Sequence, residues 1–144
     1  MYTGNERLSK NFKLHEFTDS EKATKLGVDN LAQLTQQNYI NIEALCVNVL
    51  QKVRDMIEVP IHVSSGFRCR LVNKAANGAT KSQHMKGEAA DLCCADNKRL
   101  AEIIEKNGKY DQMIKYLRPD GSIRFIHVSW KRNGGNRKQR LVSK

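Results

Sequence analysis

Long hydrophobic segments are missing from this 144-residue sequence, and their absence excludes whole classes of protein. No apolar run approaches the roughly 20 residues that a membrane-spanning helix needs. The beginning of the chain, MYTGNERLSKNFKLHEF, also lacks the apolar core of a signal peptide. We therefore expect no membrane span, and we expect synthesis in the cytoplasm without a signal peptide.

Cysteine pairs at metal-binding spacing are missing as well. None of the 4 cysteines forms a CxxC pair, and the adjacent Cys93 and Cys94 would point to opposite faces of a strand. We expect reduced, mostly buried thiols rather than disulfides or a thiolate metal site.

Acidic residues are scarce relative to basic ones. The chain has 25 Lys and Arg against 15 Asp and Glu, a formal net charge of +10, which favours an anionic partner. A nucleic acid, an anionic cell-wall polymer and an acidic peptide would all satisfy this charge. Because the sequence has no recognised nucleic-acid motif or aromatic platform, we do not expect nucleic-acid binding. Much of the excess lies in residues 131–144, which we expect to be a solvated basic tail.

The length and the 40% hydrophobic content favour a single domain over residues 1–144, with a loose lead-in over residues 1–11. Apolar residues at steps of three and four predict a long helix from Asn38 to Ile57. A helix followed by strands, without repeated strand–helix–strand units, predicts an α+β fold with a mainly antiparallel sheet packed with helices. We expect further helices over 71–76 and 96–107, and strands over 59–64, 88–94, 110–117 and 123–130.

Two histidines and an aspartate form a candidate metal site. His84 lies in a loop, Asp91 on the strand that follows it, and His127 on a later strand. A single histidine on a strand is more often structural than metal-binding, but two imidazoles and one carboxylate together match a three-ligand zinc site that leaves a fourth position for water. Asp91 is flanked by small apolar residues, where an unpaired carboxylate would be costly. We assign Arg68 to docking a carboxylate or steadying an oxyanion, because its planar fork is always charged.

Several motifs closely resemble the M15 zinc peptidases, a family that includes D-Ala-D-Ala carboxypeptidases and phage endolysins that cut peptidoglycan stem peptides. They are SSGFR at 64–68, Asn73, GATKSQHMKGEAAD at 78–91 and IHVS at 126–129, with weaker likeness near 11–17, 110–112 and 136–139. The resemblance implies a hedgehog/DD-peptidase-like fold and zinc on His84, Asp91 and His127. It also implies that Arg68 faces the substrate and that Ser82 helps to hold the substrate's carboxylate.

The sequence departs from the family pattern at one catalytic position. Family members place a Glu or Asp, the general base, where this chain has Tyr116, and Arg124 does not replace it. We assign Tyr116 to substrate binding and take Asp120 as the candidate substitute base, with Asp111 behind it.

The leading hypothesis is therefore a zinc-dependent peptidase that hydrolyses peptide bonds in peptidoglycan stem peptides. The alternative, motivated by Tyr116, is a catalytically impaired module of the same fold that holds zinc and binds cell-wall peptide. Without a secretion signal, the family comparison suggests a phage, prophage or mobile-element protein that acts on the cell wall after release. The sequence predicts no oligomeric state.

Overall fold

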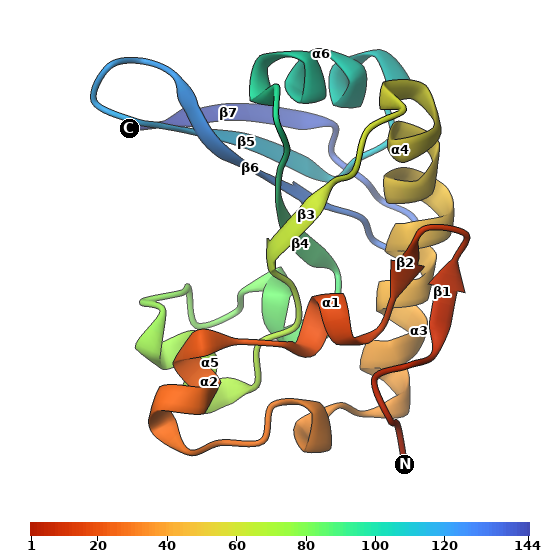
Figure 1. Cartoon of the computed structure of the whole chain (residues 1–144), viewed down its shortest axis with the longest axis vertical. Helices are drawn as coiled ribbons and strands as arrows, with labels where there is room; N and C mark the ends of the chain where they lie inside the picture. The colour runs from red at the N-terminus through yellow and green to blue at the C-terminus, as the bar shows by residue number, and fades with distance from the viewer.

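A five-stranded sheet forms the centre of the computed structural model, which describes residues 1–144. Its strand order is β3-β4-β6-β5-β7 (Figure 1). All neighbouring strands are antiparallel except β5 and β7, which are parallel. The α+β class and the mainly antiparallel sheet are thus confirmed. The strands are β3 His62–Ser65, β4 Ala89–Cys93, β5 Gln112–Leu117, β6 Ile123–Ser129 and β7 Gln139–Ser143.

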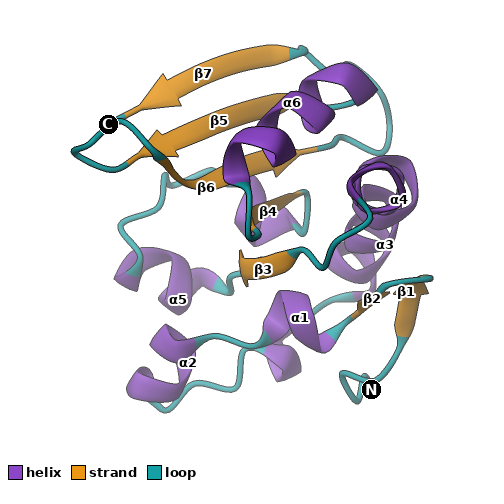
Figure 2. Cartoon of the chain, turned by 45° about the horizontal axis from the view of Figure 1, so that its top comes forward, coloured by secondary structure: helices purple, strands orange, loops and turns teal.

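The long helix predicted from the apolar spacing is confirmed, with one irregular turn inside it. It consists of α3 Gln36–Leu45, a π-helical segment Cys46–Leu50 and α4 Gln51–Ile57. Its apolar stripe is buried, except that Met56 lies at the edge of the stripe and is exposed. The other helices are α1 His15–Thr18, α2 Glu21–Leu26, α5 Arg70–Ala75 and α6 Asn97–Asn107, with 3-10 turns at Leu31–Gln33 and Gln83–Lys86 (Figure 2). None of these helices combines the length and the hydrophobicity that crossing a membrane requires.

The sheet separates the hydrophobic core from the candidate site, because successive side chains along a strand point to opposite faces. One face carries the fully buried Leu92, Met113 and Ile126, which belong to the core cluster together with residues of α4 and α6. The opposite face carries Asp91 and His127, which line a pocket. This is the alternation that the sequence predicts for the strand around Asp91 and for the strand around His127.

The N-terminal segment is more ordered than expected. Residues 1–11 were expected to be a loose lead-in, but β1 Arg7–Ser9 pairs with β2 Phe12–Lys13 in a short hairpin. Leu8 in that hairpin is only 4% exposed and belongs to the hydrophobic core. This one buried leucine, set among polar neighbours, is too weak a pattern to predict the hairpin.

The C-terminal segment also differs from the solvated basic tail that we expected for residues 131–144. Its last part is β7, which extends the sheet beside β5. Leu141 and Val142 in this strand stay exposed, so the segment shows little of the alternation that marks a half-buried strand. Main-chain hydrogen bonds hold it to β5, beginning with the Gln139 N–H, which donates to the carbonyl of Asp111 at 3.0 Å.

Candidate metal centre

Strand register places two of the predicted ligands side by side. Asp91 on β4 and His127 on β6 are direct Cα partners in an antiparallel pair. Their side chains therefore leave the sheet on the same face as direct cross-strand neighbours. The Oδ1 atom of Asp91 lies 3.0 Å from Nδ1 of His127, and both residues are buried.

The third predicted ligand, His84, comes from the 3-10 turn Gln83–Lys86 that precedes β4. The Ser82 hydroxyl caps this turn by accepting a hydrogen bond from the His84 N–H at 3.2 Å. The Nδ1 atom of His84 lies 2.7 Å from the carbonyl oxygen of Gly66. Because a carbonyl can only accept, Nδ1 carries the proton and Nε2 is left with its lone pair for a metal. That Nε2 atom lies 3.3 Å from Oδ1 of Asp91.

The long helix fixes this turn from behind. Asn41 of α3 donates to the carbonyl of Lys86 at 2.9 Å, and Asn38 donates to that of Met85 at 3.4 Å. Gly87 ends the turn with a φ of 78°, and a Cβ there would lie 2.5 Å from the carbonyl oxygen of Asn38. Only glycine fits both the left-handed backbone and this close approach. The turn that carries His84 is therefore rigidly attached to α3.

The donor set suits a divalent zinc ion. One atom from each of His84, Asp91 and His127 lies within 4.8 Å of the others, and all three residues are buried. Two neutral imidazoles and one carboxylate are the ligands of an open catalytic zinc site. Burial raises the pKa of the Asp91 carboxyl, but the adjacent His127 and His84 imidazoles outweigh burial and hold that pKa well below its ordinary value. Asp91 is thus ionised, as a ligand must be.

Arg68 supports the same carboxylate from the other side. Its Nη2 lies 3.4 Å from Oδ2 of Asp91, the oxygen that neither histidine contacts. Its Nε donates to the Ser65 hydroxyl at 3.0 Å and its Nη1 to the Asn73 amide oxygen at 3.4 Å. Burial lowers the pKa of Arg68, and the negative charge of Asp91 opposes that shift. Arg68 therefore orients Asp91 and also lines the pocket, as its predicted role requires.

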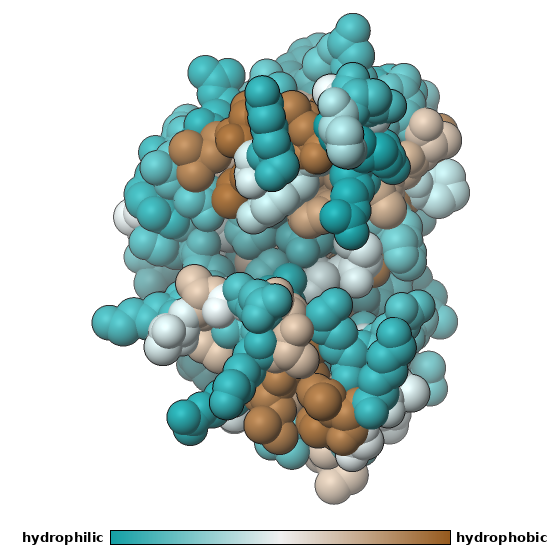
Figure 3. All heavy atoms as spheres, turned by 90° about the vertical axis from the view of Figure 1, so that its left-hand side faces the viewer, coloured by the Kyte–Doolittle hydropathy of each residue, from teal (hydrophilic) through white to brown (hydrophobic).

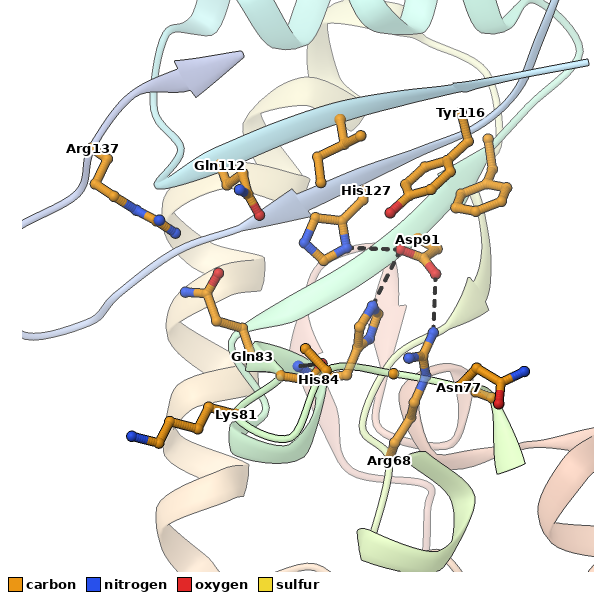
Figure 4. Close-up of a pocket in the computed structure, with 16 residues that line it drawn as sticks. Arg68, Asn77, Lys81, Gln83, His84, Asp91, Gln112, Tyr116, His127 and Arg137 are labelled. Atoms are coloured by element: carbon orange, nitrogen blue, oxygen red, sulfur yellow. Dashed lines mark hydrogen bonds and ion pairs between the residues drawn. The ribbon is translucent and has the colours of Figure 1, made fainter. Parts of the chain in front are cut away.

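The three candidate ligands lie in the wall of a cleft of about 590 Å³. Seen from the left-hand side of Figure 1, the surface is hollowed between an upper and a lower part, and hydrophilic residues line the hollow (Figure 3). The close-up in Figure 4 shows His84, His127 and Asp91 converging at the middle of this cleft. Asp91 is the only carboxylate among the lining residues, which also include Arg68, Lys81 and Arg137. The cleft is therefore built for an anionic or electron-rich ligand.

Tyr116, which we predict to bind substrate, also lines the cleft. Its ring stacks on Phe125, its direct partner across β5 and β6, with centroids 4.5 Å apart and planes at 15°. Burial and then the charge of Asp91 raise the pKa of Tyr116, with Arg68 opposing them. The phenol is therefore neutral near pH 7 and offers a hydrogen-bond donor rather than a base.

The structure does not bring Asp120 to the site. This residue is exposed in the turn between β5 and β6 and is not among those that line the cleft. Its Oδ1 accepts hydrogen bonds from the Ser122 N–H at 2.9 Å and from the Ser122 hydroxyl at 2.6 Å. The carboxylate therefore stabilises its own turn.

Asp111, the acid that we placed behind Asp120, is fully buried and is not a lining residue either. The Arg137 guanidinium donates to both of its oxygens, at 3.1 and 2.8 Å, and Gln83 donates to it at 3.1 Å. Its role is to join the segment after β6 to the turn that carries His84.

Sequence reasoning did not anticipate one half of the cleft, which contains Lys81, Gln83, Gln112 and Arg137. The alternation of β5 could have placed Gln112 in the cleft, because Gln112 shares a face of the strand with Ile114 and Tyr116. Arg137 lies in a loop without alternation, and the weak family likeness near 136–139 is its only signal in the sequence.

Comparison with known proteins agrees with this geometry. A search of curated proteins found no match to the chain. A family model described as Peptidase M15 matches residues 10–129, a range that includes all three metal-site residues and Arg68. That match covers most of the sequence, and membership of a peptidase family implies a peptide substrate. The chain belongs to the M15 peptidase family.

Proposed function

We propose that this protein is a zinc-dependent peptidase that hydrolyses peptide bonds in peptidoglycan stem peptides. The observation that supports it most is the convergence of His84, Asp91 and His127 within 4.8 Å at the wall of an open cleft. Zinc bound there would polarise a scissile carbonyl and lower the pKa of a water ligand to about 7.

The side chains around the ligands would bind and orient the peptide. Arg68 offers its charge beside Asp91, and the Ser82 hydroxyl, which accepts from the His84 N–H, keeps its own proton to donate to a substrate carboxylate. Tyr116 supplies a neutral donor on the facing wall. These donors suit a peptide carbonyl and a carboxylate in the same substrate.

A second candidate function follows from the absence of a proton acceptor. No carboxylate other than Asp91 lines the cleft, and Asp91 is committed to the metal site. A general base contributes typically 10²- to 10⁴-fold to a hydrolysis rate. Its loss would favour the alternative, a catalytically impaired module that holds zinc and binds cell-wall peptide.

One experiment separates these functions. Purified protein is loaded with one equivalent of zinc and incubated with peptidoglycan, and new amino groups are measured with and without a chelator. Chelator-sensitive release supports the peptidase. Stoichiometric zinc and peptide binding without release supports the module, and a protein that binds no zinc contradicts both.

A further inference from the structure

We propose that the cleft has a second anion-binding subsite, formed by Lys81 and Arg137 on the side of the metal centre opposite Arg68. This subsite would select peptides that carry a carboxylate on that side of the scissile bond. The inference rests on the proposed peptidase function and adds a specificity determinant to it. We call this half of the cleft, which also contains Gln83 and Gln112, the Arg137 arm.

Arg137 is held in place by a buried partner. Its Nε and Nη2 atoms bind the two oxygens of Asp111 at 3.1 and 2.8 Å, and the Asp111 side chain is fully buried. This bidentate geometry fixes the plane of the guanidinium. Its Nη1 atom has no hydrogen-bond partner in the protein, and half of the Arg137 side chain is exposed. The free edge is therefore pre-oriented at the cleft, which lowers the entropy cost of binding an anion.

Asp111 does not cancel the positive charge of the arm. Lys131 also approaches the Asp111 carboxylate, at 3.9 Å, so two cations share one anion. Lys81 adds a further positive charge, is exposed and forms no ion pair. Glu88 also contacts the arm, with its Oε1 3.4 Å from Nε2 of Gln83. Three cations, Lys81, Arg137 and Lys131, thus face two carboxylates, and the net charge of the arm is positive.

The position of the Arg137 arm relative to Arg68 predicts where a substrate would carry its negative charges. In Figure 4, Arg137 and Lys81 lie on one side of the two histidines, whereas Arg68 and Asn77 lie on the other. A peptide whose scissile bond lies at the metal centre would therefore meet cations in both directions along the cleft. Stem peptides fit this pattern because they carry a free carboxylate within the chain as well as one at the C-terminus.

Two matched peptides test the subsite. The first is L-Ala-γ-D-Glu-L-Lys-D-Ala-D-Ala, and the second has the α-carboxyl of the glutamate converted to an amide. Binding to the zinc-loaded full chain is measured by calorimetry, and hydrolysis is followed separately. We expect the acid to bind about tenfold more tightly than the amide at low salt, a difference of about 1.4 kcal/mol, and we expect the preference to weaken as salt is added.

Substitutions locate the preference. In Arg137→Gln and in Lys81→Gln the ratio of the two dissociation constants should fall toward one. The Arg137→Gln variant leaves the Asp111 carboxylate without its partner, so the double variant Asp111→Asn/Arg137→Gln serves as a control. It should lose the preference for the acid peptide to the same extent. Lys98→Gln removes an exposed cation on α6, across the sheet from the cleft, and should keep the full preference.

The outcomes separate this inference from the proposed function. Hydrolysis of both peptides with equal affinity would overturn the subsite and leave the peptidase intact. An acid preference that depends on Arg137, without any hydrolysis, would support the subsite and contradict the peptidase. A preference that survives in both single variants would also overturn the subsite, and failure to bind either peptide would overturn both ideas.

Discussion

Asp91 and His127 face each other across β4 and β6, with Oδ1 of the carboxylate 3.0 Å from Nδ1 of the ring. The hydrogen-bonded ladder of the sheet thus places two of the candidate metal ligands side by side. The third, His84, comes from a turn tied to α3 and to the carbonyl of Gly66. A site supported by a sheet and a long helix is pre-organised, so binding a metal there would require little rearrangement of the fold.

Replacing His84 with Gln should abolish tight zinc binding. The variant keeps a polar side chain of similar reach but loses one of three ligands, and we expect zinc affinity to fall by about 100-fold or more, beyond the range seen when supporting partners of a metal ligand are lost. Zinc content after dialysis and the zinc-dependent rise in Tm measure the effect, because a ligand that binds only the folded state stabilises it. His62→Gln is the matched control, since His62 is exposed on β3 outside the cluster. Full zinc occupancy in His84→Gln would refute the ligand assignment.

Gly66→Ala should destabilise the fold and disturb the metal centre together. A Cβ at this position would lie 2.6 Å from the Cα and the carbonyl oxygen of Phe17, and backbone there has little room to move. We expect the free energy of unfolding to fall by about 1–3 kcal/mol, as for other overpacked sites. Because the Gly66 carbonyl holds Nδ1 of His84, zinc affinity should fall as well.

Gly27→Ala provides the comparison for that variant. Gly27 also has a demanding backbone, with a φ of 68°, but nothing lies within 4 Å of a Cβ there. It should lose about 1 kcal/mol through backbone strain alone and bind zinc normally. Equal zinc affinity in Gly66→Ala and Gly27→Ala, measured by competition with a chromogenic chelator, would contradict the proposed role of the Gly66 carbonyl.

The parts of the fold that the sequence predicted are those with strong periodicity. The helix at 36–57 has an apolar stripe over several turns, and the strand around Asp91 alternates between core and cleft. The convergence of the candidate ligands was predictable because three residues of two metal-binding types, two histidines and one aspartate, appear in a specific pattern. Whether these side chains meet depends on the pairing register of the strands. In the sequence, only the alternation of apolar and polar residues indicates that register.

The remaining parts depend on contacts between distant segments. Neither Leu8 nor Leu141 has a periodic pattern around it, so β1 and β7 escaped prediction. Arg137 reaches the cleft because buried Asp111 binds it across 26 positions of sequence. Asp120 looked suitable as a base because of its chemistry, but it lies at an exposed turn and binds Ser122. The type of a residue indicates which chemical role it can take, but the path of the loop that carries it determines whether its side chain reaches the site.

Asp111 should make the stability of the protein depend on acid pH. Burial raises the pKa of this carboxyl, but hydrogen bonds from Arg137 outweigh it and lower the pKa to about 2. Since an unfolded aspartate titrates near pH 3.9, the folded state gains stability that is fully present above about pH 4. That contribution is lost as the pH falls from about 4 toward 2, where the folded state also takes up the proton.

Asp111→Asn tests this link. At neutral pH the variant should lose about 2 kcal/mol of unfolding free energy, the value of hydrogen bonds to a charged group. Denaturant titrations between pH 7 and pH 2.5 should show the gap between wild type and variant narrowing below pH 4. A gap that stays constant with pH would mean that Asp111 contributes through packing rather than through its charge.

Tyr116→Glu should show whether the missing proton acceptor limits turnover. Residue 116 lines the cleft beside Arg68 and Asp91, at the position where the family resemblance implies an acidic base. If zinc binding is retained, we expect the rate of stem-peptide hydrolysis to rise by about 10²-fold, within the range that general bases supply. Tyr116→Phe keeps the stack on Phe125 without the hydroxyl and should show no such gain, so it separates the effect of the carboxylate from that of altered packing. A fully zinc-loaded Tyr116→Glu variant that is no faster than wild type would show that the lack of a carboxylate at position 116 does not limit turnover.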